Sequence, residues 1–455
     1  MIMSVDMITM KERLGALCEE YRRHNGFNAQ DYQTYGVKRG LRNPDGTGVM
    51  AGLTNICNVH GFMMADGVRV PDEGKLTYRG IDVRDIVKAC VDENRFGYEE
   101  TAWLLLFGSL PTESQLETFK NTLGELRDLP DGFVEDMIMK SPSKDIMNKM
   151  GRSVLALYSF DDDPDGTSLE NVMRQSIQLI ASLPTIMTSA YQVKRRAFDK
   201  ESMFFHPTDV TLSAAQSILR ALRPDRSFTD TEAKLLDLCM ILHAEHGGGN
   251  NSTFAARVLS SSGTDTYATL SAAIGSLKGP RHGGANLRVR KMMEELKEEV
   301  QDWKDEEEIY RYLASIVKKE KNDRSGLIYG FGHAVYTLSD PRACILKQTA
   351  EKLAEEKNMT DEYALYKTVE KLTPLVMAEV KGSSKVICAN VDFYSGFVYD
   401  MLGIPGDLFT PMFAVSRIAG WCAHRIEEIT YGGRIIRPAY RAMVRGKHYT
   451  PIAER

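Results

Sequence analysis

The chain has 455 residues, of which 43% are hydrophobic and 26% charged, with a formal net charge of −5. This composition is typical of a soluble globular protein with two or three domains. The charge balance gives no basic surplus and argues against a nucleic-acid-binding protein. The seven cysteines are scattered and form no Cys-x-x-Cys pair, which predicts free thiols in a reducing compartment.

No segment of the sequence has the pattern of a signal peptide or a membrane span. Acidic residues interrupt the N-terminus, and the longest uncharged stretch, residues 175–193, contains Pro184 and several polar residues. A kinked helix of the core explains this stretch better than a transmembrane helix does. We therefore expect a cytoplasmic protein.

Apolar residues recur at helical spacing along most of the chain, which predicts a mainly α fold. The first predicted helix covers residues 10–22. A short N-terminal β element is expected over residues 54–78, where β-rich runs alternate with Gly67 and Gly74. Beyond it, helices are predicted over residues 98–107, 113–127, 169–193, 212–222, 231–243, 266–278, 285–300, 306–318, 361–379 and 410–428.

The most informative segment is Gly-Pro-Arg-His-Gly-Gly-Ala-Asn at residues 279–286, which sets His282 at a glycine-rich turn before an amphipathic helix. The positive end of that helix and the neighbouring cation Arg281 disfavour a charged imidazole. A neutral histidine can donate a hydrogen bond to a carbonyl and so stabilise an enol or enolate. The alternative is a capping turn whose histidine only packs against its neighbours.

Two later segments add to this chemistry. Residues 328–336 place His333 after a second glycine turn, and residues 390–396 carry Asp392 between two apolar neighbours. Partial desolvation is expected to raise the pKa of Asp392 and its strength as a base, although an isolated Asn-Val-Asp is more often a turn. Two histidines and a carboxylate can remove a proton from carbon, hold the enol and polarise a second carbonyl. This set points to an aldol or Claisen-type condensation.

Together these segments resemble the signature motifs of the citrate synthase family, and they occur in the family's order. The matching segments are residues 243–251, 279–286, 330–342 and 390–396. Two further segments, 413–417 and 434–438, lie where the family keeps substrate arginines. The resemblance runs from about residue 78 nearly to the end of the chain.

The resemblance implies a large helical domain built from residues 1–283 and 401–455, with a smaller helical domain, residues 284–400, inserted between these two parts. The active site would then lie in the cleft between domains, and closure of the cleft would assemble it and exclude water.

The resemblance also assigns roles to residues. Asp392 is the base that takes a methyl proton from acetyl-CoA, His282 stabilises the enol, and His333 polarises the ketone of oxaloacetate. Oxaloacetate, a dianion, would be bound by His246, Arg342, Arg417, Phe413 and Arg437, the last contributed by the partner subunit of a homodimer. Asn250 is the asparagine that matches the family pattern, and its contact with substrate is left open.

CoA is expected at the glycine-rich loop made of Tyr329, Gly330, Phe331 and Gly332. Family members usually carry Lys or Arg four residues after the second catalytic histidine, to contact the CoA phosphates, whereas this chain has Thr337. The phosphate contact is therefore missing or comes from elsewhere, with Arg281 and Lys278 as candidates. No metal and no cofactor is implied, and acetyl-CoA serves as co-substrate.

Three alternatives to a citrate synthase remain. A 2-methylcitrate synthase, which uses propionyl-CoA, differs by one methylene in the acyl pocket, and this pocket cannot be read from sequence. A metal-dependent hydrolase could use His243 and His246, although no third ligand is evident. A non-catalytic binder of CoA or a dicarboxylate would have no need of Asp392 together with His282 and His333.

Overall fold

The computed structural model describes residues 7–26, 28–382, 386–444 and 446–455. The chain divides into two compact units, one made of Met1–Ala51 with Arg437–Arg455 and the other of Gly52–Ile436. The first unit contains helices α1 (Met7–His24) and α2 (Ala29–Thr34). Within this unit the Arg441 guanidinium lies 5.2 Å from the centre of the Tyr35 ring. The helix predicted over residues 10–22 is confirmed.

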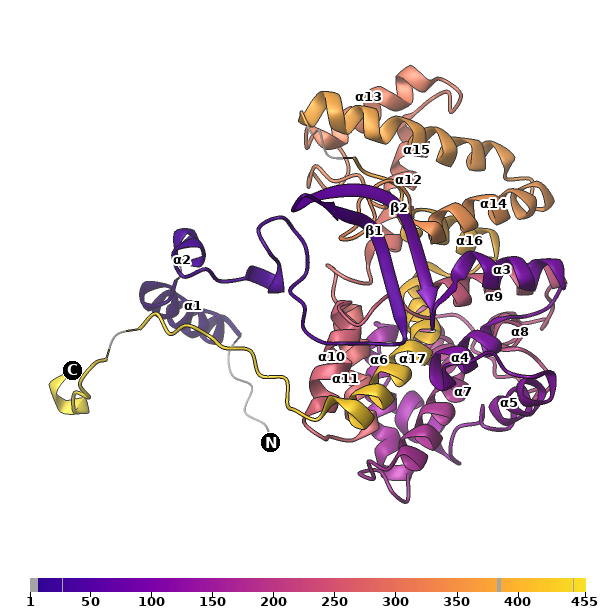
Figure 1. Ribbon diagram of the computed structural model, residues 1–455, viewed down its shortest axis with the longest axis horizontal. Helices are drawn as coiled ribbons and strands as arrows, with labels where there is room; N and C mark the ends of the chain where they lie inside the picture. The colour runs from indigo at the N-terminus through magenta and orange to yellow at the C-terminus, as the bar shows by residue number, and fades with distance from the viewer. Residues whose placement is uncertain (1–6, 27, 383–385, 445) are drawn as a thin grey trace. The chain divides into compact units, whose positions relative to one another are not determined.

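The second unit is mainly helical, as predicted (Figure 1). No helix among the described residues is both long enough and apolar enough to cross a membrane. The helices are α3 (Val83–Asp92), α4 (Tyr98–Phe107), α5 (Glu113–Glu125), α6 (Ile146–Ala156), α7 (Leu169–Lys194), α8 (Ala214–Leu222), α9 (Asp230–His243), α10 (Asn251–Ser261), α11 (Thr266–Lys278), α12 (Ala285–Glu299), α13 (Glu306–Val317), α14 (Pro341–Glu356), α15 (Thr360–Lys381), α16 (Val391–Met401) and α17 (Phe409–Glu427).

Every helix predicted in this unit is present, and five further helices were not predicted. These five are α3, α6, α10, α14 and α16. Each begins at an Asp or Asn whose side chain accepts a hydrogen bond from a backbone N–H of the first turn, namely Asp82, Asp145, Asn250, Asp340 and Asn390. Such caps satisfy N–H groups that have no partner within the helix. Two of these starts, at α14 and α16, carry predicted site residues.

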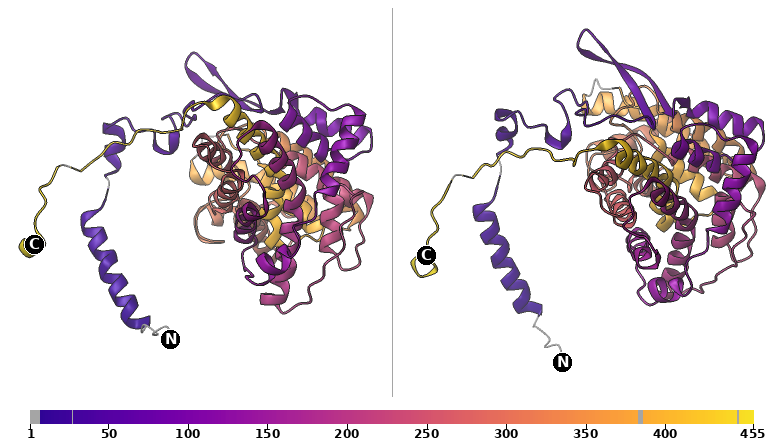
Figure 2. Two further views of the ribbon diagram at one scale, coloured as in Figure 1. Left: turned by 90° about the horizontal axis from the view of Figure 1, so that it is seen from below. Right: turned by 60° about the horizontal axis from the view of Figure 1, so that its bottom comes forward.

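Helix α17 lies among the other helices of the unit, as two further views show (Figure 2). It contacts α4, α7, α9, α10 and α11, and residues 411–425 are all buried. A helix buried on all sides needs apolar residues around its whole circumference, and each polar residue on it needs a partner. Arg425, for example, donates to Thr266, Ser260, Thr269 and the carbonyl of Thr264.

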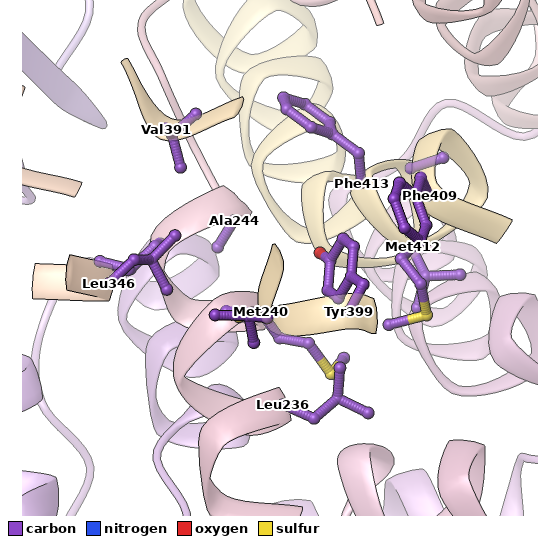
Figure 3. Packing of buried hydrophobic residues seen from close by; sticks show 14 of the residues in the cluster. Leu236, Met240, Ala244, Leu346, Val391, Tyr399, Phe409, Met412 and Phe413 are labelled. Carbon is purple, nitrogen blue, oxygen red and sulfur yellow. The ribbon is translucent and has the colours of Figure 1, made fainter. Parts of the chain in front are cut away.

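The core beneath the candidate site is formed where α9, α14, α16 and α17 meet (Figure 3). The labelled side chains from these helices are buried and belong to one hydrophobic cluster. They are Leu236, Met240 and Ala244 from α9 and the residues after it, Leu346 from α14, Val391 and Tyr399 from α16, and Phe409, Met412 and Phe413 from α17. Because this core is close-packed, it fixes the starts of α14 and α16 relative to α17.

The predicted β element is a small antiparallel sheet of β1 (Cys57–Ala65), β2 (Val68–Tyr78) and β3 (Ile81–Asp82). Its hairpin packs against the loop of residues 335–341. Arg69 donates to the carbonyl of Val335 at 3.0 Å, and Thr337 donates to the carbonyl of Gly61 at 2.9 Å. Glycine is required at these contacts, since a Cβ on Gly61 would lie 2.8 Å from backbone atoms of Tyr336 and Val335. The hairpin therefore fixes the position of this loop.

The predicted domain boundaries, at 283/284 and 400/401, stay a prediction. The division into compact units falls elsewhere, at 51/52 and 436/437.

We predict that Gly74→Ala destabilises the protein. A Cβ on Gly74 would lie 2.0 Å from the carbonyl oxygen of Ser339, so the hairpin and the loop must separate. Forced packing of this kind typically costs about 1–3 kcal/mol. Urea unfolding should show a lower midpoint. The matched control is Gly275→Ala on α11, where the added methyl meets nothing within 4 Å, and stability should be unchanged or slightly raised. Equal midpoints for the two variants would contradict the described packing.

Candidate active site

The turn that carries His246 connects α9 to α10 and is anchored to α17. Gly247 adopts a left-handed φ of +88°, which lets the chain reverse directly after His246. The Glu245 carboxylate accepts the Gly247 N–H at 2.5 Å and the Nε2–H of His424 at 3.0 Å. Arg257 in turn donates to Nδ1 of His424 at 2.7 Å. This buried chain of hydrogen bonds holds the turn in place.

His246 is buried at the meeting point of this turn and the loop of His333. Its ring lies edge-on to that of His333, with centroids 4.9 Å apart, and its Nε2 is 3.2 Å from the Tyr336 hydroxyl. Burial holds the pKa of His246 well below its usual range, and Arg342 and His333 lower it further. The ring is therefore neutral near pH 7.

His333 is oriented by its own loop. Its Nδ1 accepts the backbone N–H groups of Val335 and Tyr336 at 3.0 and 3.1 Å, and the ring stacks on Tyr336 with centroids 4.6 Å apart. A neutral imidazole that accepts at Nδ1 carries its proton on Nε2. The ring is thus arranged to donate a hydrogen bond through Nε2.

Asp340 joins the starts of α14 and α16. Its carboxylate accepts Nε and Nη2 of Arg342 at 3.0 and 2.7 Å, and it also accepts the backbone N–H of Arg342 and of Val391. The Arg342 guanidinium is buried and held by two parallel hydrogen bonds, which fix its plane. The Val391 contact places Asp392, the next residue, in the same site.

Asp392 lies in the first turn of α16, not in the isolated turn that was the alternative. The pKa of its carboxyl is raised from an ordinary value of 3.8 to about 6. Burial is the main cause, Arg342 and Arg417 oppose the shift, and Asp340 adds to it. The predicted desolvation is confirmed. A carboxylate with a pKa near 6 is mostly ionised at pH 7 and is a stronger base than an exposed aspartate.

His282 lies directly before α12, which begins at Ala285 as expected. Its Nε2 accepts the backbone N–H of Ser252 at 3.3 Å and lies 3.1 Å from the Ser252 hydroxyl, which places the proton of a neutral ring on Nδ1. The pKa of His282 is lowered to about 4. Burial is the main cause and Arg417 the second, so the prediction of a neutral ring is confirmed whereas its explanation through Arg281 was wrong.

Arg417 is fully buried on α17 and only partly satisfied. Its Nε donates to the carbonyl of His243 at 2.6 Å, and its guanidinium lies 4.6 Å from the centre of the Phe413 ring. Its two terminal nitrogens, Nη1 and Nη2, have no hydrogen-bond partner among the described residues. Leaving such donors unpaired is costly, and a planar guanidinium suits a carboxylate. The geometry therefore calls for an anionic ligand next to His246.

Comparison with known proteins agrees with this site. The sequence model of the family described as citrate synthase, C-terminal domain, matches residues 43–439. The chain belongs to the citrate synthase family. It is 35% identical over 395 residues to the citrate synthase of Haloferax volcanii, covering 84% of this chain and 94% of that protein. It is 31% identical over 425 residues to 2-methylcitrate synthase 1 of Corynebacterium glutamicum, covering 92% and 98%.

A solved structure of the same family is also similar. It is the ternary complex of citrate synthase from the thermophilic archaeon Thermoplasma acidophilum with carboxymethyl coenzyme A and oxaloacetate. The TM-score is 0.74 at 28% sequence identity, over 92% of this chain and 99% of that one.

The glycine-rich loop predicted to bind CoA has several of its backbone groups in hydrogen bonds within the protein. Gly330 and Gly332 have φ values of +84° and +82°, which explains both glycines. The carbonyl of Gly330 accepts the backbone N–H of Asn390, and the carbonyl of Gly332 accepts the Asn390 side-chain amide. The Gly332 N–H donates to the backbone carbonyl of Cys388. Thr337, the departure from the family pattern, is buried against Gly61, and Lys278 pairs with Asp145 at 3.4 Å. CoA binding at Tyr329, Gly330, Phe331 and Gly332 stays a prediction.

Two other predicted residues need separate comment. Arg437 is exposed and belongs to the unit formed by both chain ends, so its contact with substrate stays a prediction. Asn250 caps α10 by accepting from the backbone and hydroxyl of Ser252, which gives it a structural role. The role of Ser252 was not predicted from the sequence. Its contact with His282 spans 30 residues, and no sequence motif indicates it.

The described residues offer no set of metal ligands around His243 and His246. His243 lies 2.8 Å from the carbonyl of Cys239 through Nδ1, and its ring packs edge-on against Phe413. Within the described part of the chain, no group of three or more His, Cys, Asp or Glu side chains is placed to hold a metal ion.

We predict that Asp392→Asn stabilises the folded protein at alkaline pH. A carboxyl whose pKa rises on folding binds its proton more tightly in the folded state, so its ionised form destabilises the fold. The gain should be on the order of 2 kcal/mol at pH 8, shrink as pH falls through 6, and vanish near pH 4. Urea unfolding across this pH range measures it. Asp131→Asn, at an exposed site, is the control. A variant no more stable than the parent at pH 8 would contradict the burial of this carboxyl.

Proposed function

We propose that the protein is a citrate synthase, which condenses acetyl-CoA with oxaloacetate and hydrolyses the resulting citryl-CoA to citrate and CoA. The observation that carries the proposal is the buried Arg417 guanidinium, whose Nη1 and Nη2 have no partner among the described residues. Family membership and three suitably protonated catalytic groups support it. The relatives named citrate synthase include the structure with bound oxaloacetate.

Oxaloacetate would bind against Arg417 and Arg342. Arg417 offers both terminal nitrogens to one carboxylate, in the bidentate geometry that guanidinium groups favour. Arg342 already uses Nε and Nη2 on Asp340, which leaves Nη1 for substrate. His246 would donate to the substrate from between the two arginines, and Phe413 would line the pocket beneath Arg417.

Enolisation of acetyl-CoA would use Asp392 and His282 together. Asp392 takes the methyl proton, and the Nδ1–H of His282 donates to the thioester oxygen as negative charge develops there. A positioned base typically contributes about 10²–10⁴-fold to the rate, and an oxyanion donor about 10²–10³-fold. His282 must be neutral to stabilise an enol without protonating it, and its low pKa meets this requirement.

The condensation would use His333. Its Nε2–H polarises the ketone of oxaloacetate, the enol carbon attacks the ketone carbon, and His333 protonates the new alkoxide. Water then hydrolyses the thioester of citryl-CoA and releases CoA as a thiol. The reaction as proposed uses no metal and no redox cofactor.

A 2-methylcitrate synthase is the second candidate, since relatives of both names match the chain over similar lengths. The two activities differ by one methylene of the acyl group, which a pocket discriminates by only about 1–3 kcal/mol. A cytoplasmic location is proposed as well, supported by seven cysteines that are all free thiols.

Thiol release tests the function. Purified protein with oxaloacetate should release CoA from acetyl-CoA, and the ratio of kcat/KM for acetyl-CoA and propionyl-CoA names the activity. Asp392→Asn should lower kcat by about 10²–10⁴-fold, because the base is lost. Its unchanged oxaloacetate binding, measured by calorimetry, serves as the control. Release that does not require oxaloacetate, or no release with either thioester, would contradict the proposal.

A homodimer with Arg437 acting across the interface is also proposed. The unit that contains Arg437 exposes large apolar side chains, including Leu17, Met50, Tyr440 and Val444, as expected of a surface that a second subunit covers. Mixing inactive Asp392→Ala and Arg437→Ala subunits tests it. Random reassociation should restore about a quarter of parental activity, because half the dimers are mixed and each has one intact site. No recovery would mean that Arg437 acts within its own subunit, and full activity of Arg437→Ala alone would mean that the reaction does not need Arg437.

A further inference from the structure

A cavity lies within the unit Gly52–Ile436 and shares no lining residue with the candidate active site. Its volume is about 80 Å³. It is formed by Arg127, which follows α5, by the second half of α7, by helix α8 and by the segment of residues 204–209. The mechanism proposed above uses none of these elements' side chains.

Two arginines line this cavity. Arg127 is 5% exposed and donates only to backbone carbonyls, those of Asp209 at 2.8 Å and of Leu212. Arg220 lines the cavity from α8. The Asp209 carboxylate also lines it, but this group accepts hydrogen bonds from the N–H and hydroxyl of Thr211. The lining thus holds one carboxylate and two guanidinium groups, and the buried Glu99 carboxylate, outside the lining, also acts on Arg127.

Hydrogen-bond donors around the cavity outnumber their acceptors. Nε2 of Gln192, Oγ of Ser217 and Nε of Arg220 are buried and have no partner among the described residues. Gln192 is only 1% exposed, and its Oε1 is already occupied by the backbone N–H of Phe204. Buried polar groups in proteins are rarely left unpaired, so three on the wall of one cavity indicate a ligand that accepts hydrogen bonds.

The size and walls of the cavity restrict that ligand. About 80 Å³ is enough space for one tetrahedral oxyanion. Phe204, Phe205 and Pro184 supply apolar walls, and Thr188 and Ser189 supply hydroxyls.

We propose that this cavity binds a small oxyanion, either a phosphate or a short carboxylate, through Arg127, Arg220, Gln192 and Ser217. The ligand would accept the hydrogen bonds that Gln192, Ser217 and Arg220 leave unpaired. Because α7 packs directly on α17, occupancy would stabilise the helical core that also carries Arg417. The site is independent of turnover, so it stands or fails apart from the proposed function.

Binding is tested by calorimetry and thermal unfolding of the full chain, with inorganic phosphate and malonate titrated separately at constant ionic strength. The parent protein should bind at least one of the two saturably and gain about 1–2 °C in Tm. Arg220→Gln and Ser217→Ala should each weaken binding, the former by about tenfold or more. Arg196→Gln, which removes an exposed arginine that does not line the cavity, should bind as the parent does.

The outcomes separate this cavity from the substrate arginines. Binding lost in Arg220→Gln and Ser217→Ala but kept in Arg417→Gln supports the proposal, and the anion that binds identifies the phosphate or carboxylate form. Binding kept in both cavity variants but lost in Arg417→Gln would belong to the candidate active site and overturn it. No saturable binding of either anion by the parent would overturn it as well.

Discussion

The candidate site depends on one carboxylate, that of Asp340. It caps α14, holds Arg342 by two parallel hydrogen bonds, and accepts the N–H of Val391 at the start of α16. It therefore fixes the Arg342 guanidinium and the position of Asp392 with the same two oxygens. Arg342 and further hydrogen bonds keep the pKa of Asp340 below its usual range despite complete burial, so the carboxylate is charged near neutral pH.

The two buried arginines control protonation as well as charge. Burial is the main reason why His246 and His282 are neutral, and Arg417 lowers the pKa of both. A dianion bound between Arg342 and Arg417 would offset this field, so substrate binding should move both histidines toward their ordinary pKa values. The partial opposition of the same arginines to the raised pKa of Asp392 keeps this base ionised near neutral pH. Binding and proton transfer thus share one set of charges.

The sequence was sufficient for the fold class and for most helices, because these follow from local periodicity. Its ordered motifs also named residues that the structure brings together, although their catalytic roles stay predictions. It missed α14 and α16, which begin at the side-chain caps Asp340 and Asn390. It also attributed the neutral state of His282 to its chain neighbour Arg281. The cation that lowers the pKa of His282 is Arg417, which lies 135 positions later in the chain. Contacts of this kind, like that of Thr337 with Gly61, are set by tertiary packing and leave no local pattern.

The hairpin contacts bear on the order in which the site forms during folding. His282 and Ser252 are only 30 residues apart, so their half of the site can close early. Thr337 meets Gly61 across 276 residues, and Gly74 meets Ser339 across 265. Long loops are slow to close. The loop of His333 should therefore dock after the helices around His282. His333 is then expected to be the last of the candidate catalytic groups to reach its place in a refolding chain.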